Sequence, residues 1–252
     1  MDLDDFVAGH ILGAFMVFVR FGTAAMFLPG FGETYVNARA RLSLAAVISI
    51  ALYPVTPVPI LPDLDLSGLV RLIALEGLVG LWIGLTARIL FIALYYAGAL
   101  AGYTSGLANA LAPSLGSFEG ATSVASAFLI TALVLMFATD THHVIIRALL
   151  FSYDMMPFGQ SPMLGDMTEQ MSRAVSASMR IGLTIAAPFI VLSLMINLGL
   201  GLANRAMPNL PVFFIAQSGL IATGFIVLAV AAPGMLRTFL GIFADWFGTF
   251  TI

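Results

Sequence analysis

The chain contains no cysteine in its 252 residues, which excludes disulfide cross-links and every metal site or nucleophile that depends on a thiolate. It also contains no lysine, so all ten basic residues are arginines. A planar guanidinium that is always charged suits buried or interfacial pairing better than adhesion to a lipid surface. The net charge of −3 shows none of the basic excess that nucleic-acid-binding proteins carry, and we expect no nucleic acid partner.

Charged residues of either sign are scarce, at 9% of the chain, whereas 60% of the residues are hydrophobic and the mean hydropathy is +1.04. Typical soluble domains carry about 25% charged and 45–50% apolar residues. A chain of this length cannot bury so much apolar surface in a water-soluble core, so we expect its main solvent to be lipid, or a large protein assembly that acts like lipid. The sequence therefore predicts an integral membrane protein.

The apolar segments also lack the period-two alternation of a membrane β-barrel. They are rich in Leu, Ala, Ile and Met, with many small residues that let helices approach closely, so we expect an all-α fold. The acidic start of the chain, MDLDD, is unlike the basic start of a signal peptide, and the first segment is interpreted as a retained helix. The segments cover 6–28, 42–61, 68–103, 121–151, 174–203 and 211–243.

Two features do not fit a simple bundle of six spanning helices. About 20 residues cross the hydrocarbon layer, yet segments 68–103 and 121–151 are far longer and must kink, extend out of the bilayer or form helical hairpins. Arginines also fall on both sides of a six-helix topology, which leaves no positive-inside signal. They are Arg39, Arg41 and Arg205 on one side, and Arg71, Arg147, Arg173, Arg180 and Arg237 on the other.

Several ionisable side chains lie inside or at the ends of the apolar segments, where leaving a charge in lipid is costly. We interpret them as groups that pair with one another or with a partner chain and so hold an assembly together. The alternative is a proton or ion relay through Asp140 and the two adjacent histidines. The residues are Arg20, Glu76, Arg88, Asp140, His142 and His143. Those assigned to charge pairing in assembly are Arg20, Arg41, Glu76 and Arg205.

No catalytic or metal-binding motif accompanies these residues. Neighbouring positions on a helix point about 100° apart, so His142 and His143 are not expected to chelate one ion together. Neither an HExxH pattern nor a GxSxG nucleophile motif occurs in the sequence. We therefore expect no enzymatic activity, no metal and no cofactor.

Glycines recur at helical spacing in two places. In the stretches EGLVGLWIGL and AGALAGYTSG, the glycines form a stripe without side chains along the helix, which allows close helix packing. We expect packing within the chain, and the alternative is that one stripe docks a neighbouring subunit. The glycines are Gly77, Gly80 and Gly84 in the first stretch, and Gly98, Gly102 and Gly106 in the second.

Five regions of the chain carry a recognisable series of glycines, prolines and charges. They are VRFGTAAMFLPGFGE (19–33) followed by ARARLSLA (38–45), EGLVGLWIGL (76–85), AGALAGYTSGLANALAPSLGSFEG (97–120), THHVIIRALLFSYDMMPFG (141–159) and INLGLGLANRAMPNLPVFFIAQSGLIATG (196–224). In this order they resemble the FliR family, the membrane component of the flagellar type III export gate, and more distantly its SctT relatives in injectisomes. The last region, with its Leu-Gly-x-x-x-Arg-x-x-Pro pattern, is the most specific.

The resemblance implies a non-enzymatic subunit that forms the portal for unfolded flagellar substrates across the bacterial inner membrane, in the flagellar basal body. It implies one FliR-like domain over 1–252, similar to fused FliP-like and FliQ-like units. Its implied partners are FliP-like and FliQ-like subunits, with FlhB-like and FlhA-like proteins nearby. Helical hairpins that rise partly out of the membrane plane would explain the over-long segments. The alternatives are an SctT-like injectisome subunit and a transporter of ions or small molecules.

The segment GLANALAPSLGSFEG at 106–120 is small and nearly uncharged, and the resemblance implies that it is a plug in the central passage of the complex. Gly106 and Gly116 let the backbone adopt several conformations, and Pro113 opposes collapse into a helix. Apolar side chains along the segment would exclude water and so block ions at rest. The alternative is a flexible connector. The apolar residues are Leu107, Leu111, Leu115 and Phe118.

Overall fold

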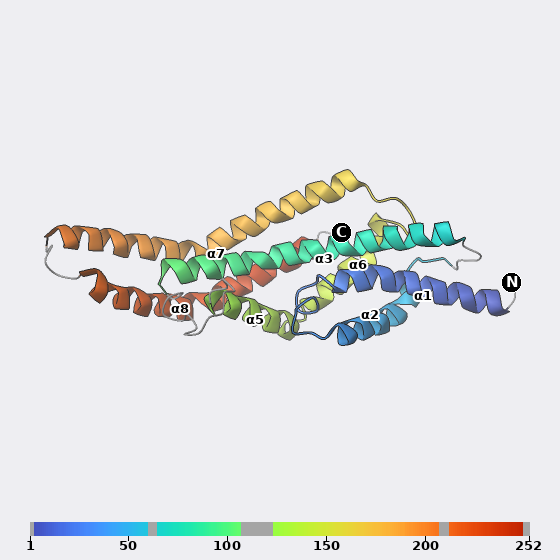
Figure 1. The fold of residues 1–252 in the computed structure, drawn as a ribbon, viewed down its shortest axis with the longest axis horizontal. Coiled ribbons are helices and arrows are strands. Elements are labelled where there is room, and N and C mark those ends of the chain that lie inside the picture. Colours follow the sequence, from blue (N-terminus) through green and yellow to red (C-terminus); the bar gives the residue numbers. More distant parts are fainter. Residues whose placement is uncertain (1–2, 60–64, 107–122, 207–211, 249–252) are drawn as a thin grey trace. The chain divides into compact units, whose positions relative to one another are not determined.

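The computed structural model describes residues 3–59, 65–106, 123–206 and 212–248. Within these ranges the backbone is helical with short connections and contains no strand (Figure 1), so the predicted all-α fold is confirmed. The elements are α1 (Leu3–Ala25), α2 (Ala38–Leu52), the 3-10 helix η1 (Tyr53–Val55), α3 (Leu66–Thr104), α5 (Ser123–Ala138), α6 (His142–Met155), α7 (Leu164–Ala206) and α8 (Val212–Gly248).

Five of the described helices are long and apolar enough to span a membrane, and a sixth span is added if α5 and α6 count as one broken span. α3 has 39 residues and α7 has 43, which corresponds to about 58 and 65 Å at a rise of about 1.5 Å per residue. The hydrocarbon layer is only about 30 Å thick. Segment 68–103 is therefore one continuous helix that is longer than a bilayer crossing, whereas segment 121–151 is divided between two helices.

α7 begins ten residues before the apolar segment predicted at 174–203, at Leu164. Its first two turns are polar, and their charges favour a helix. Asp166 lies in the first turn, where a negative charge complements the positive end of the helix. Glu169 forms an ion pair with Arg173, four residues later on the same face. Hydropathy does not detect this part of the helix, because most of its residues are polar, although Met167 is buried and its carbonyl accepts a hydrogen bond from the Trp82 Nε1–H at 3.2 Å.

The chain divides into two compact units, and α3, α7 and α8 each contribute residues to both. The first unit contains α1, α2, α6 and the start of α3, and the second contains α5 and most of α7 and α8. In residue ranges, the first unit is Met1–Leu90, Asp140–Ala174 and Ala244–Ile252, and the second is Phe91–Thr139 and Val175–Phe243.

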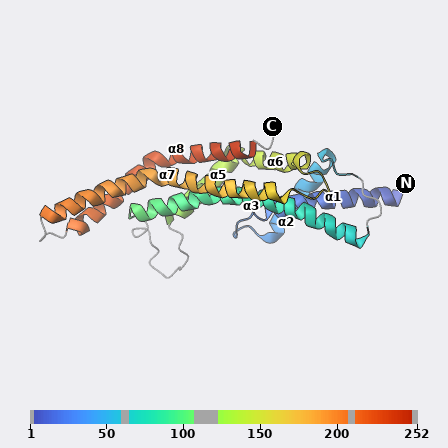
Figure 2. The ribbon, with the colours of Figure 1, turned by 90° about the horizontal axis from the view of Figure 1, so that it is seen from above.

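In the first unit, α1 lies between α2 and α3 (Figures 1 and 2). Asn37 caps the start of α2, because its side-chain oxygen accepts a hydrogen bond from the Arg39 N–H at 3.0 Å. Asp65 caps the start of α3 by accepting hydrogen bonds from the Ser67 hydroxyl and the Gly68 N–H. These bonds, with that from Ser67 the strongest, hold the pKa of Asp65 below its ordinary value. The two caps determine where these helices begin.

In the second unit, α3, α5, α7 and α8 share an apolar core. Ala101, Val124 and Phe189 are its fully buried members, and side chains of α8 pack against them. Phe91 of α3 also contacts Phe239 and Phe243 of α8 edge-on, with ring centroids 5.2 Å apart in both pairs. Such aromatic pairs contribute about 0.5–1.5 kcal/mol each beyond their burial. The α8 residues against the core are Ile221, Val227, Leu228 and Met235.

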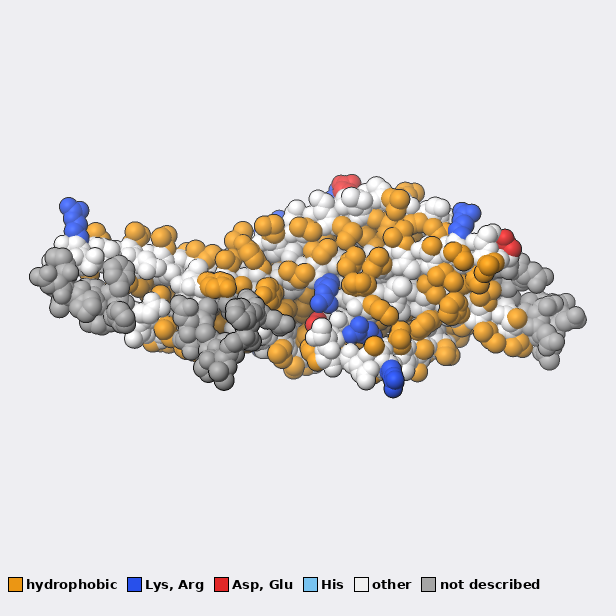
Figure 3. All heavy atoms as spheres, viewed as in Figure 1, with side chains coloured by type: hydrophobic (Ala, Val, Ile, Leu, Met, Phe, Trp, Pro, Cys, Tyr) orange, Lys and Arg blue, Asp and Glu red, His pale blue; other side chains and the backbone are white. Residues whose placement is uncertain are grey.

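Large hydrophobic side chains remain exposed on α7 and α8. On the face drawn in Figure 3, hydrophobic side chains are spread widely and charged ones are few. Water is a poor solvent for such a surface, so lipid or partner helices are expected to cover it. The exposed residues include Val191, Leu194, Met195, Leu198 and Leu202 of α7, and Phe225, Ile226 and Val230 of α8.

Candidate functional site

Arg20 of α1 is the largest polar side chain in the core of the first unit, with 1% of its surface exposed. Its Nε donates a hydrogen bond of 2.7 Å to Oε2 of Glu76 on α3, which is equally buried. A buried charge is stable only if it is paired and its hydrogen-bonding groups are satisfied. Arg20 and Glu76 are paired with each other, and further contacts satisfy their remaining hydrogen-bonding groups.

The rest of the Arg20 guanidinium faces α6 and the turn after it. Nη1 donates to the Ser152 hydroxyl at 3.0 Å, and Nη2 donates to the Met156 carbonyl at 3.2 Å. The guanidinium carbon lies 3.7 Å from the centroid of the Tyr153 ring, in a cation–π contact. Arg20 therefore joins three helices that are far apart in the sequence.

Glu76 has a second partner in the turn between α6 and α7. Its Oε1 accepts a hydrogen bond of 3.2 Å from the Gly159 N–H. Gly159 has φ 71°, a left-handed conformation that a residue with a side chain adopts only at a steric cost. The turn and the ion pair therefore support each other. We call Arg20, Glu76, Ser152, Tyr153 and Gly159 the buried charge network.

The first glycine stripe explains how Arg20 can reach Glu76. A Cβ added at Gly80 would overlap the carbonyl oxygen of Arg20, and one added at Gly84 would lie 2.6 Å from the Ala24 carbonyl oxygen. Gly77 is in ordinary contact with α1, at 3.7 Å from Val19 and Thr23 for an added Cβ. The backbones of α1 and α3 are thus in direct contact along this stripe, which packs within the chain.

The second stripe lies in the second unit. A Cβ added at Gly98 would lie 2.5 Å from the Cα of Ala125, so α3 and α5 are also in backbone contact. Gly102 is buried one turn later. Gly106 ends the helix with φ 72°, and an added Cβ there would meet the Gln217 side-chain amide at 2.6 Å. Gly98 and Gly106 each exclude a larger residue for a local geometric reason.

The other two arginines assigned to assembly have different surroundings. Arg41 donates from Nη2 to the carbonyl of Glu33 at 2.8 Å, and no described residue accepts a hydrogen bond from its buried Nε. Its side chain lines an apolar pocket together with Leu44 and Ile48. Arg205 is exposed in the last turn of α7, where a positive charge complements the helix dipole. The assembly role of all four charged residues stays a prediction.

Most of the predicted plug lies outside the described residues, and only Gly106 can be placed. The residues outside are Leu107, Leu111, Pro113, Leu115, Gly116 and Phe118.

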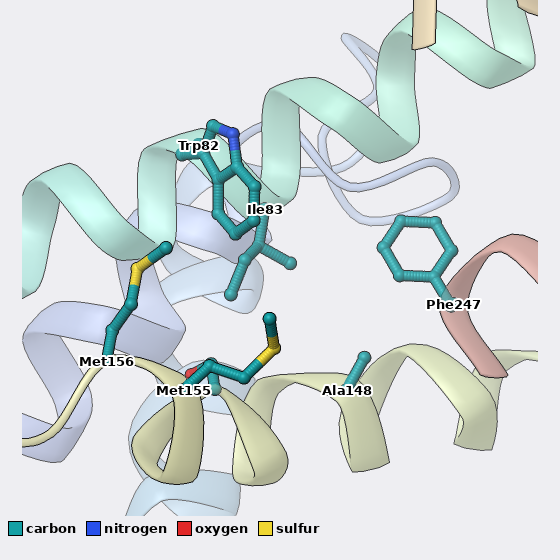
Figure 4. Close-up of a pocket in the computed structure, with 7 residues that line it drawn as sticks. Trp82, Ile83, Ala148, Met155, Met156 and Phe247 are labelled. Carbon is teal, nitrogen blue, oxygen red and sulfur yellow. The ribbon is translucent and has the colours of Figure 1, made fainter. Parts of the chain in front are cut away.

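An apolar pocket adjoins the buried charge network (Figure 4). The figure shows side chains of α3, α6 and α8 turned toward a shared space. Its polar side-chain groups are already engaged. The Ser152 hydroxyl accepts from Arg20 and donates to the Leu149 carbonyl at 2.6 Å, and the Trp82 Nε1–H donates to the Met167 carbonyl at 3.2 Å. A pocket without convergent polar groups offers no means of orienting a ligand. The labelled residues are Trp82, Ile83, Ala148, Met155, Met156 and Phe247.

The sequence assigns no role to Ser152, Tyr153 or Gly159, although the serine and the Pro-x-Gly turn of the stretch 141–159 are part of the family resemblance. A serine and a tyrosine in an apolar helix are common, and no spacing rule links them to Arg20. The one local signal is the Pro-Phe-Gly turn at 157–159, since a glycine after a helix indicates a left-handed residue.

Comparison with known proteins adds an independent finding. The sequence model of the family described as "Bacterial export proteins, family 1" matches residues 11–246. The chain is 32% identical over 250 residues to the flagellar biosynthetic protein FliR of Caulobacter vibrioides, covering 97% of this chain and 98% of that protein. It is 29% identical to the protein of the same name from Pectobacterium carotovorum, covering 87% and 84%. The Escherichia coli protein is 29% identical, with 81% and 78% covered.

Proposed function

The chain belongs to family 1 of the bacterial export proteins, together with the flagellar biosynthetic protein FliR, and from this membership we propose that it is a structural and gating subunit of the flagellar type III export apparatus. A role in flagellar export follows from the family. The proposal adds that the chain helps to form the portal through which unfolded substrates leave the cytoplasm, across the inner membrane.

The observation that carries the proposal is the extent of the family match. Residues 11–246 include every described helix except the ends of α1 and α8, and the Caulobacter relative is matched over nearly its whole length. The match therefore covers nearly all of the described fold. The long apolar helices agree with a membrane-embedded subunit of that apparatus.

The gating part of the proposal assigns the plug to residues 106–120. Gly106 supports a defined start for this segment, because its left-handed backbone lies against Gln217 of α8 and leaves no room for a side chain. The leucines and the phenylalanine of this segment would exclude water from the passage.

The proposed partners are FliP-like and FliQ-like subunits in one hetero-oligomer, next to FlhB-like and FlhA-like proteins. The exposed leucines and methionines of α7 and the exposed phenylalanine and valine of α8 support helical neighbours, because a water-exposed surface of this kind is rare. Copurification of a tagged chain with mass measurement of the complex tests this. A stable monomer without FliP-like or FliQ-like partners would contradict it.

The gate is tested by electrical conductance through the purified complex after deletion of residues 110–117. If these residues seal the passage, conductance and leakage rise while the complex still assembles. A polar replacement of residues 110–117 that keeps their number is measured beside the deletion. Both variants remove the apolar seal, so both should raise the conductance. Unchanged conductance together with unchanged secretion would contradict the gate and indicate that the chain acts only as an assembly scaffold.

A transporter of ions or small molecules is the second candidate function. It requires Asp140 and the adjacent histidines to relay protons or ions, so Asp140→Asn or His143→Ala would abolish export while the complex still assembled. Glu76 is a poor relay group, because both of its oxygens are engaged with Arg20 and Gly159 in the buried charge network. Full export in both variants would remove this candidate.

A further inference from the structure

The short break between α5 and α6 contains an unusual backbone conformation. Asp140 has φ 56°, and it is the only residue other than glycine with a positive φ in the described part of the chain. Asparagine and aspartate tolerate this conformation best, but it still costs about 1–2 kcal/mol. Strained residues of this kind often mark a functional position. What the conformation achieves here is to aim the Asp140 carboxylate at the first turn of α6.

Two histidines occupy that first turn. Oδ1 of Asp140 lies 3.6 Å from Nδ1 of His143, and the His142 and His143 rings lie side by side with centroids 4.1 Å apart. One ligand atom from each of the three residues lies within 4.8 Å of the other two. The two adjacent rings therefore do not point apart here, contrary to the prediction from ideal helix geometry. The first turn of a helix has no preceding turn to restrict its side chains, so the two rings can lean together.

The donor set identifies the class of ligand. Two imidazole nitrogens and a carboxylate oxygen suit borderline transition ions such as Zn²⁺, whereas Mg²⁺ and Ca²⁺ prefer oxygen ligands alone. We propose that Asp140, His142 and His143 form a binding site for a borderline divalent metal ion such as Zn²⁺, with water in the remaining position.

The distances allow this with small side-chain movements. Zn²⁺ bonds of about 2.0–2.1 Å in a tetrahedron place neighbouring ligand atoms roughly 3.3–3.5 Å apart. The Oδ1–Nδ1 separation of 3.6 Å between Asp140 and His143 is close to this range, whereas the other ligand atoms, which lie within 4.8 Å of one another, must move closer together. The Asp140 and His143 side chains are 77% and 55% exposed, so they can close the gap by rotation, without moving a helix.

The electrostatics also favour the site. The start of α6 carries about half a positive charge from the helix dipole, which opposes a cation. The Asp140 carboxylate carries a full negative charge and outweighs it. The first N–H groups of α6 are occupied as well, since His143 N donates to the Asp140 carbonyl and Val144 N to the Thr141 carbonyl, both at 3.0 Å. A bound ion would hold the break in its left-handed conformation, because its ligands come from the break and from α6.

The test is zinc binding to the purified full-length chain, in its complex if it requires one, with an affinity tag that contains no histidine. The chain itself has only three histidines. Histidines of a tag and metal-binding buffer components are therefore the main competing ligands, and they are left out. Calorimetric titration with ZnCl₂ should show a saturable site that excess MgCl₂ does not displace. His142→Gln, His143→Gln and Asp140→Asn should each weaken it at least about tenfold, since even residues behind the ligands typically contribute 10–100-fold. Asp140→Asn keeps a residue that tolerates positive φ, so the backbone is preserved.

Matched controls come from the same unit. His10→Gln removes the remaining histidine, whose Nδ1 lies 2.8 Å from the Phe6 carbonyl oxygen. Asp154→Asn removes an exposed carboxylate farther along α6. Neither should change zinc affinity. X-ray absorption at the zinc edge should report two imidazole ligands in the original chain and one in His143→Gln. Equal binding by the original chain, His143→Gln and Asp140→Asn, or no saturable binding at all, would overturn the proposal. Because the readout is metal binding, its failure leaves the export role untouched.

Discussion

Arg20 and Glu76 are 56 residues apart in the sequence, yet Nε of the arginine lies 2.7 Å from a carboxylate oxygen of the glutamate, and both side chains are 1% exposed. Hydrogen bonds from Arg20 to Ser152 and to the Met156 carbonyl, and from Gly159 to Glu76, complete the arrangement. The buried charge network thereby connects α1, α3, α6 and the turn that leads into α7. Its contribution to the fold can be measured.

Removing one partner of the ion pair should destabilise the chain more than removing both. Arg20→Met or Glu76→Gln should each lower the free energy of unfolding by about 3–5 kcal/mol, because each leaves a buried group without its partner. The double variant Arg20→Met/Glu76→Met should recover part of this loss. Unfolding in mixed micelles with increasing SDS measures the difference. Arg180→Met, at an exposed position, is the control. Equal losses in single and double variants would show that the pairing is unimportant.

The stability of the chain should depend on the Tyr153 ring but not on its hydroxyl. No described residue forms a hydrogen bond with this buried hydroxyl, and an unsatisfied buried group costs about 1–3 kcal/mol. Tyr153→Phe should therefore leave stability unchanged or raise it by up to this amount. Tyr153→Leu should lower stability, because it removes the cation–π contact with Arg20, worth about 1–2 kcal/mol. A loss on Tyr153→Phe as large as that on Tyr153→Leu would contradict this account.

Gly80→Ala should separate α1 from α3. The added methyl would overlap the Arg20 carbonyl oxygen and the Thr23 hydroxyl, so the backbones must move apart. Overpacking of this kind costs about 1–3 kcal/mol. Gly165→Ala is the matched control, because nothing lies within 4 Å of the added Cβ and alanine favours a helix by up to about 1 kcal/mol. The same SDS titration should show opposite signs for the two variants.

Gly106→Ala should disturb the start of the proposed plug. Alanine at φ 72° costs about 1–2 kcal/mol, and its Cβ would also press on the Gln217 amide. If 106–120 seals the passage, this variant should raise the resting conductance of the purified complex. Gly219→Ala on α8, with open space around the new Cβ, should not. An unchanged conductance in Gly106→Ala, with assembly intact, would argue for a connector.

Part of the fold could be predicted because it depends on local properties of the sequence. The apolar stretches, the absence of period-two alternation and the glycine spacings are sufficient to predict long helices in close contact. The start of α7 at Leu164 could not be predicted from hydropathy, because Asp166, Glu169 and Arg173 make its first turns polar. The length of segment 121–151 predicts a kink or a hairpin, but its position at Asp140 could not be predicted, since a left-handed aspartate has no signature in the sequence.

The sequence by itself determined the solvent of this protein, its helical class and its family, because each of these depends on residue types and their order along the chain. Only the tertiary structure decided which charges meet. Arg20 had several possible acidic partners in the sequence, and Glu76 is selected by the bare glycine face that brings α3 against α1. The three residues at the α5–α6 break meet through local backbone geometry instead, because the positive φ of Asp140, which the sequence does not reveal, turns its carboxylate toward two imidazoles. Distances between elements depend on packing geometry, which residue order alone does not contain.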